Sequence, residues 1–312
     1  MLRNRAFLFL FMLLTLHIAS AQKVERLYNV SPTDTASNYT LVLSPPSGKP
    51  KGLVLLFAGF GESPVDLLKE SAFPIQAAKA GYLVALPNIS NNTVLFLTDK
   101  RQEQLVQLVR DVQKRYKLQD KKVAVGGFSM GGTTAVKFAE YSLSSPSVPK
   151  VAALLAIDPL LDLERFERTI LKAVQRDASA RPKQMLRMLQ NMLQQDFGST
   201  PAQEPEKFYT VSPYVYSDTA NTAIKPLRQL PVLFYSEPDV VNQFQTNHRD
   251  LYDLNAADCT AMITDLQSMG NKQAQLILTI GKGNRADGTI NPHSWSIMDV
   301  DTTVKWLLQH LK

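Results

Sequence analysis

Short apolar runs alternate with segments of helical periodicity along most of the chain. A continuous run of five or six apolar residues is typical of a strand buried on both faces of a sheet. Apolar residues at intervals of three and four indicate a helix with one buried face, as for Leu105, Leu108, Val109 and Val112 within 99–116. The alternation of the two patterns predicts a mostly parallel sheet with helices on both faces.

The same pattern sets the expected order of the elements. It predicts strands at 38–43, 52–57, 82–86, 122–125, 151–157, 231–235 and 274–280. It predicts helices at 72–80, 99–116, 130–141, 246–269 and 300–311. Between about residues 160 and 230 the alternation stops, and Met185, Leu186, Leu189 and Leu193 follow helical spacing. We therefore expect one α/β domain over residues 22–312, with a doubly wound sheet and a helical cap inserted at about 160–230.

The first 21 residues have the features of a secretory signal peptide. Arg3 and Arg5 precede an apolar run at 6–16, and small residues end the segment at 19–21. This pattern predicts cleavage after Ala21 and a secreted or periplasmic protein. The run is shorter than the roughly 20 residues of a transmembrane helix, and no later segment of the sequence is long and apolar enough, so we expect no membrane span after cleavage.

Composition excludes several classes of function. The formal charge of +6 is modest, and no basic cluster is interleaved with aromatic residues, so we expect no nucleic-acid partner. The single cysteine, Cys259, lies in a helical pattern without a glycine-flanked turn, which favours a buried thiol over a nucleophile. No metal, flavin or nucleotide motif is present, so we expect neither a metal nor a cofactor. The sequence contains no pattern that indicates an oligomeric state.

The strongest chemical signal is Gly127-Phe128-Ser129-Met130-Gly131, placed between a predicted strand and a predicted helix. A sharp strand-to-helix turn puts its central residue in strained backbone geometry, and its neighbours must lack side chains. Such a turn lifts the hydroxyl of Ser129 out at the carboxyl end of the sheet. Ser129 is therefore the candidate nucleophile.

A serine hydroxyl needs a base and an acid that orients the base. His293 follows the predicted strand at 274–280 and precedes the last helix, which places it at the same edge of the sheet and makes it the candidate base. For the acid we prefer Asp239, which follows the strand at 231–235. Glu237 in the same segment and Asp158 at the end of the strand at 151–157 remain alternatives; Asp158 has a competing role as a helix cap.

An oxyanion needs two backbone N–H donors. We expect one from Met130, directly after the candidate nucleophile. The other is expected from the glycine-rich turn after the strand at 52–57, where Phe60 is our choice.

These segments together resemble the α/β-hydrolase superfamily. The resemblance extends from Leu53 to Leu311 and rests on 58–61, 127–132, 236–239 and His293 before a final helix. It implies a nucleophile, an acid and a base at the positions named above, and a cap over the site. Many members have His-Gly where this chain has Ala58-Gly59, so the resemblance implies no named esterase group.

The machinery implies acyl transfer to water through an acyl-enzyme on Ser129, with a small-molecule acyl substrate. A carboxylic ester or thioester is the expected substrate. The first alternative is a serine peptidase or aminopeptidase of the same fold, which would need carboxylates near the site to hold a free amine; Glu164 and Glu167 are the candidates. The second alternative is a binding protein that keeps the fold without activity.

Overall fold

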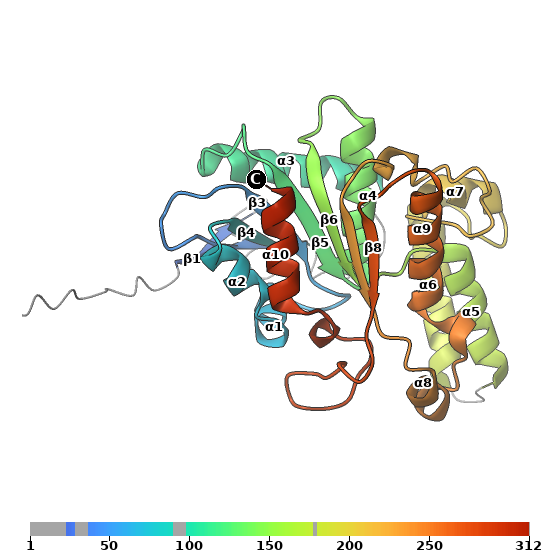
Figure 1. Cartoon of the computed structure of the whole chain (residues 1–312). Coiled ribbons are helices and arrows are strands. Elements are labelled where there is room, and N and C mark those ends of the chain that lie inside the picture. Colours follow the sequence, from blue (N-terminus) through green and yellow to red (C-terminus); the bar gives the residue numbers. More distant parts are fainter. Residues whose placement is uncertain (1–22, 29–36, 90–97, 177–179, 312) are drawn as a thin grey trace, which may run out of the picture.

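The computed structural model describes residues 23–28, 37–89, 98–176 and 180–311, and the predicted signal peptide lies outside them. Within this part, an eight-stranded sheet with the order β1-β2-β4-β3-β5-β6-β7-β8 forms the centre of the molecule (Figure 1). The strands are β1 (Val24–Tyr28), β2 (Asn38–Leu43), β3 (Leu53–Phe57), β4 (Leu83–Ile89), β5 (Val123–Phe128), β6 (Val151–Ile157), β7 (Val232–Ser236) and β8 (Ala274–Leu278). From β4 to β8 all neighbouring strands are parallel, while β2 pairs antiparallel with both β1 and β4. The prediction of a mostly parallel sheet is confirmed.

Helices cover both faces of the sheet, and each face has its own apolar core. On one face lie α3 (Asp99–Arg115), α4 (Met130–Ser144) and α9 (Asn255–Ser268), and on the other lie α1 (Pro64–Glu70), α2 (Phe73–Lys79) and α10 (Val300–His310). All six residues of β5 are buried between the two cores. A strand that is apolar on both faces therefore occupies the middle of the sheet, as its continuous apolar run requires.

We call the segment between β6 and β7 the cap. It consists of short and long helices. It comprises α5 (Leu163–Arg176), α6 (Ala180–Phe197), η2 (Pro205–Lys207), α7 (Phe208–Val211) and η3 (Lys225–Leu227). Its apolar side chains form a third cluster, separate from the two cores of the sheet, and Met130 at the start of α4 belongs to this cluster. The cap core is therefore continuous with the carboxyl end of the sheet.

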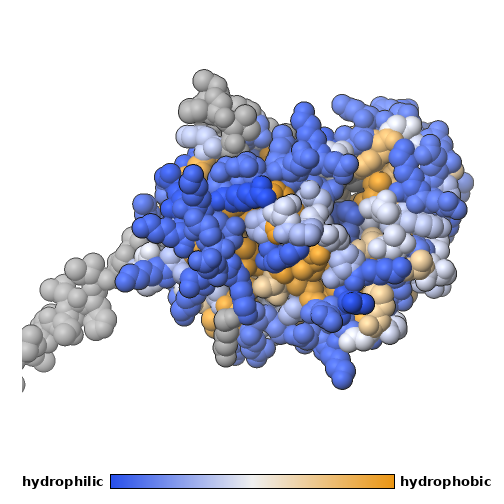
Figure 2. Space-filling model, turned by 90° about the horizontal axis from the view of Figure 1, so that it is seen from above, coloured by the Kyte–Doolittle hydropathy of each residue, from blue (hydrophilic) through white to orange (hydrophobic). Residues whose placement is uncertain are grey.

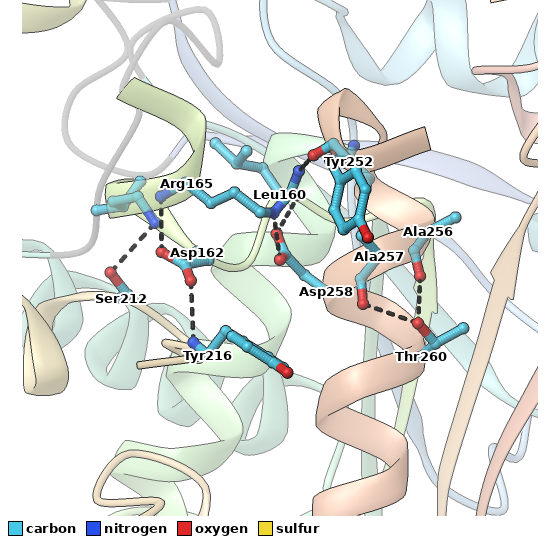
Figure 3. Close-up of polar contacts among 12 residues, drawn as sticks. Leu160, Asp162, Arg165, Ser212, Tyr216, Tyr252, Ala256, Ala257, Asp258 and Thr260 are labelled. Atoms are coloured by element: carbon cyan, nitrogen blue, oxygen red, sulfur yellow. Dashed lines mark hydrogen bonds and ion pairs between the residues drawn. The ribbon is translucent and has the colours of Figure 1, made fainter. Parts of the chain in front are cut away.

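A buried ion pair fixes the cap to α9 (Figure 3). The Arg165 guanidinium on α5 donates to both carboxylate oxygens of Asp258 on α9 and to the carbonyl oxygen of Tyr252. The Asp258 side chain is 2% exposed. One turn away, Asp162 accepts backbone N–H bonds from Arg165 and Tyr216, at 3.0 and 2.9 Å. Because an unpaired charge at this depth is costly, the pair fixes the position of α5.

The predicted single helix at 246–269 is wrong, because the chain forms three elements there. They are α8 (Val240–Asn247), η4 (Leu251–Asp253) and α9. His248 has a left-handed backbone with φ of 52°, which ends α8. Asp250 then opens η4 by accepting a backbone bond from Tyr252 in a capping box.

Seen from above, hydrophilic residues cover most of the visible surface, and hydrophobic residues show mainly in a central area (Figure 2). Among the described residues, no helix combines the length and the apolar character that crossing a membrane requires.

Candidate active site

Ser129 lies at the turn between β5 and α4 in a strained backbone conformation, with φ of 52° and ψ of −121°. The turn packs so closely that side chains are excluded on both sides of it. A Cβ on Gly127 would lie 2.3 Å from the carbonyl carbon of Gly131, and a Cβ on Gly131 would lie 2.3 Å from the carbonyl oxygen of Phe57. Both glycines are therefore required by backbone contacts, as the sequence pattern predicts.

The structure brings Ser129 and His293 within hydrogen-bond distance. The Ser129 Oγ and His293 Nε2 atoms are 2.9 Å apart. On the other side of the ring, His293 Nδ1 is 2.5 Å from Oδ2 of Asp158. His293 lies in the segment between β8 and η5 (Trp295–Ile297), where its backbone N–H donates to Oδ1 of Asn291 at 3.0 Å. A hydroxyl, an imidazole and a carboxylate joined in this order can transfer a proton from the hydroxyl to the ring.

Asp158 is held from several sides. It is the first residue after β6, has a positive φ of 44°, and donates its N–H to the carbonyl oxygen of Tyr235 at 2.8 Å. Ser236 donates its hydroxyl to Oδ1 of Asp158 at 2.5 Å, and Asn255 donates its side-chain amide to the Asp158 carbonyl at 3.0 Å. One carboxylate oxygen is thus bonded to a serine and the other faces the imidazole, so the carboxylate has a single orientation.

The prediction that Asp239 pairs with His293 is wrong. Asp239 is the N-cap of α8 and accepts the N–H of Asn242 at 3.0 Å. Glu237 also points elsewhere, since its carboxylate accepts the Thr279 hydroxyl and the N–H groups of residues 282 and 283, all within 3.0 Å. The competing helix-cap role considered for Asp158 belongs instead to Asp162, which accepts the N–H of residue 165.

A physical reason accounts for this error. All three carboxylates follow parallel strands, so sequence places all of them at one edge of the sheet. Which carboxylate faces His293 depends on strand order, and β6 is the direct neighbour of β5 in the sheet. The carboxylate at the end of β6 is therefore the one next to the Ser129 turn, whose N–H donates to Ile157 at 2.9 Å.

Phe60 and Met130 both line the cavity that contains Ser129 and His293. Phe60 lies in a turn that the N–H of Glu62 closes on the carbonyl of Gly59 at 3.1 Å, with φ of +72° at Gly61. The cavity has a volume of about 370 Å³. The roles of the Phe60 and Met130 N–H groups as oxyanion donors remain predictions.

Sequence reasoning missed Glu62, which joins two parts of the site. Its Oε2 accepts the N–H of Gly59 at 3.0 Å and the indole N–H of Trp295 at 3.1 Å, while Oε1 accepts from Arg285 at 3.2 Å. The signal was a carboxylate three residues after Gly59 in a glycine-rich turn, a spacing that allows a bond back to the start of the turn.

Cys259 on α9 is fully buried in the core, where burial raises the pKa of its thiol well above the usual value. Its side chain is therefore part of the packing. No group of three or more His, Cys, Asp or Glu side chains in the described part of the chain is placed to hold a metal ion.

Comparison with known proteins shows the fold. A model of the family described as "Alpha/beta hydrolase of unknown function (DUF915)" matches residues 89–202, a stretch that contains the Ser129 turn. No curated protein matches the chain.

Several solved structures are similar to the chain over most of its length. MPT51 (FbpC1) of Mycobacterium tuberculosis has a TM-score of 0.60 and 14% identity, covering 93% of this chain and 99% of that one. An S-formylglutathione hydrolase from Agrobacterium tumefaciens has a TM-score of 0.58 and 14% identity, covering 94% and 97%. Carboxyl esterase 2 from the fungus Tuber melanosporum has a TM-score of 0.56 and 15% identity, covering 95% and 90%. The chain has the α/β-hydrolase fold.

The close packing of the turn gives a first prediction. Gly131→Ala should lower the free energy of unfolding by about 3 kcal/mol or more, because the new Cβ meets backbone oxygen atoms that cannot move aside. Gly270→Ala is the matched control: it is strained by its φ of +93°, but nothing lies within 4 Å of its Cβ. It should cost only about 1 kcal/mol. Urea unfolding of both variants measures the difference, and equal losses would contradict the packing argument.

Proposed function

We propose that the protein is a serine hydrolase that cleaves carboxylic esters or thioesters through an acyl-enzyme on Ser129. The observation that carries this proposal is the continuous chain of contacts from Ser129 Oγ through His293 to Asp158, at 2.9 and 2.5 Å. The strained turn at Ser129 supports it, because a nucleophile must stand clear of its own backbone to reach a carbonyl carbon.

Each group has a role in the proposed reaction. Ser129 Oγ attacks the carbonyl carbon of the ester while its proton passes to Nε2 of His293. The Nδ1–H of the ring donates to Asp158, whose charge stabilises the imidazolium that forms. In this proposal the N–H groups of Met130 and Phe60 donate to the developing oxyanion, and the positive end of the α4 dipole adds to this stabilisation.

The tetrahedral intermediate then collapses. His293 returns the proton to the alcohol or thiol that leaves, and the acyl group remains on Ser129. A water molecule, deprotonated by the same imidazole, attacks the acyl-enzyme and releases the carboxylic acid. No other group is needed for the atoms and protons to balance.

The rival functions have less support. A binding protein without activity has no need for a complete and connected triad. An aminopeptidase would need a carboxylate that faces the cavity and is available to a free amine. Glu164 instead pairs with Arg168 and accepts the hydroxyl of Ser217, while Glu167 accepts the N–H of Ala202 at 3.2 Å. An ester is therefore favoured over a peptide with a free amino terminus.

The signal-like pattern of residues 1–21 supports export of the mature protein. Amino-terminal sequencing of the protein from the periplasm or medium should find Gln22 as the first residue. An intact Met1 in the exported fraction would contradict this part of the proposal.

Replacing each candidate acid separately tests the proposed triad. Asp158→Asn should lower kcat for a p-nitrophenyl ester by about 10³- to 10⁴-fold, since an amide at this position favours the wrong tautomer of His293. Asp239→Asn, which changes only the cap of α8, should leave kcat within a few-fold of the wild type. Ser129→Ala should show no turnover and no labelling by a fluorophosphonate probe. Equal losses in the two aspartate variants, or labelling of Ser129→Ala, would contradict the assignment.

A further inference from the structure

The cavity beside Ser129 has two walls of opposite character. One wall is apolar and is made by the start of α4 and by the cap: Met130, Leu160, Phe166, Ile170, Met185 and Leu189. The other wall carries amide and guanidinium side chains from α8, the segment after it, the start of α9 and the segment before His293: Gln243, Asn247, Arg249, Asn255 and Asn291. Glu237 also lines the cavity, but its carboxylate accepts the Thr279 hydroxyl and the N–H groups of residues 282 and 283. A ligand that fills the cavity must therefore have one apolar part and one polar part.

The positions of the catalytic groups decide which part is which. The oxygen that leaves must take its proton from His293, so the alcohol lies on the side of that ring. Two members of the polar wall lie on this side, because Asn291 accepts the backbone N–H of His293 and Asn255 donates to the carbonyl of Asp158, both at 3.0 Å. The apolar wall begins at Met130, directly after the nucleophile. The acyl group therefore meets the cap, and the alcohol meets the polar wall.

We infer that the substrate is an ester between an apolar acyl group of short to medium length and a polar alcohol; this inference rests on the proposed function. The volume of about 370 Å³ is near the lower end of small-molecule sites, which span roughly 300–1,000 Å³. Met185 and Met188 are flexible and adapt to an unbranched chain. Each methylene that enters the apolar wall should raise kcat/KM by up to about fourfold.

A series of p-nitrophenyl esters from acetyl to dodecanoyl tests the acyl part. The value of kcat/KM should rise up to about six to eight carbons and then level or fall. Met185→Trp fills the apolar wall and should lower the ratio of hexanoyl to acetyl turnover by about tenfold. Leu171→Trp is the matched control, because Leu171 on α5 is 38% exposed and does not line the cavity. Titration of Ser129 with a fluorophosphonate counts the folded sites in each variant.

Hexanoate esters of glycerol and of butanol test the alcohol part. The wild type should prefer the glycerol ester, and Asn247→Leu should reduce this preference while Gln245→Leu, an exposed neighbour outside the cavity, leaves it unchanged. A flat acyl series, an equal effect of the two tryptophan variants, or a preference for the butyl ester would overturn the inference while turnover persists. Absence of Ser129-dependent turnover of every ester would instead overturn the proposed function.

Glu62 carries a second, independent inference. Its carboxylate accepts the N–H of Gly59, the residue at which the turn containing Phe60 begins. It also accepts the indole N–H of Trp295, two residues after His293. The Trp295 side chain is 1% exposed, and so its position is fixed. The side chain of Glu62 is 16% exposed, which limits competition from water for these bonds.

The geometry assigns Glu62 the role of a positioning residue. It sets the position of the turn that contains Phe60 relative to His293. Loss of its carboxylate should let the turn move and should weaken binding of the transition state more than binding of the substrate. Glu62→Ala should lower kcat by about 10- to 100-fold with little change in KM. Glu62→Gln keeps an oxygen for Gly59 and Trp295 and should recover most of the loss.

A trifluoromethyl ketone inhibitor separates this role from a merely structural one, because its adduct with Ser129 places an oxyanion at the turn. Its inhibition constant should rise in Glu62→Ala by the same factor by which kcat/KM falls. Glu70→Ala is the matched control: Glu70 also bonds the segment before His293, at Ala286 N, but does not touch the turn. Unchanged inhibitor affinity in Glu62→Ala, or an equal loss in Glu70→Ala, would overturn the assignment, whereas an inactive wild type would overturn the proposed function itself.

Discussion

The structure of the site depends on one close backbone contact, the approach of the Gly127–Gly131 turn to the end of β3. A Cβ on Gly131 would lie 2.3 Å from the Phe57 carbonyl oxygen and 2.4 Å from that of Ala58. This contact places the turn that contains Phe60 beside Ser129. The N–H of Ser129 bonds Ile157 on the other side, which brings the end of β6 and Asp158 next to the same turn. Because Gly127 and Gly131 have no side chains, the carboxyl ends of β3, β5 and β6 can lie next to one another.

Two carboxylates at the edge of the sheet, Asp158 and Glu237, orient His293 and the loop that carries it. Asp158 faces the imidazole of His293 with one oxygen and accepts Ser236 with the other. Glu237 accepts backbone N–H groups at residues 282 and 283, at the start of the segment that leads to His293. One carboxylate therefore contacts His293 directly, and the other fixes the start of the loop that carries it. This division explains how a histidine more than ten residues beyond β8 reaches the serine.

Much of the fold and part of the site could be predicted from local patterns. The buried strands follow from continuous apolar runs, and Ser129 follows from glycines that a sharp turn requires. His293 could be placed because few histidines lie at the carboxyl edge of the sheet. Asp158 could not be chosen over Asp239, since the choice depends on which strands are neighbours, and that is a non-local property. Glu62 has a local signal in its spacing from Gly59, but its link to the base could not be predicted, because its partner Trp295 is 233 residues away.

Trapping of the acyl-enzyme tests the central claim most directly. Wild-type protein is mixed with excess hexanoyl p-nitrophenyl ester, quenched in acid within the first turnovers, digested and analysed by mass spectrometry. The account predicts a hexanoyl group on the peptide that contains Ser129, and on that side chain, in step with a burst of nitrophenol. A hexanoyl group on another residue, or turnover without any covalent intermediate or burst under conditions in which deacylation is slow, would contradict it.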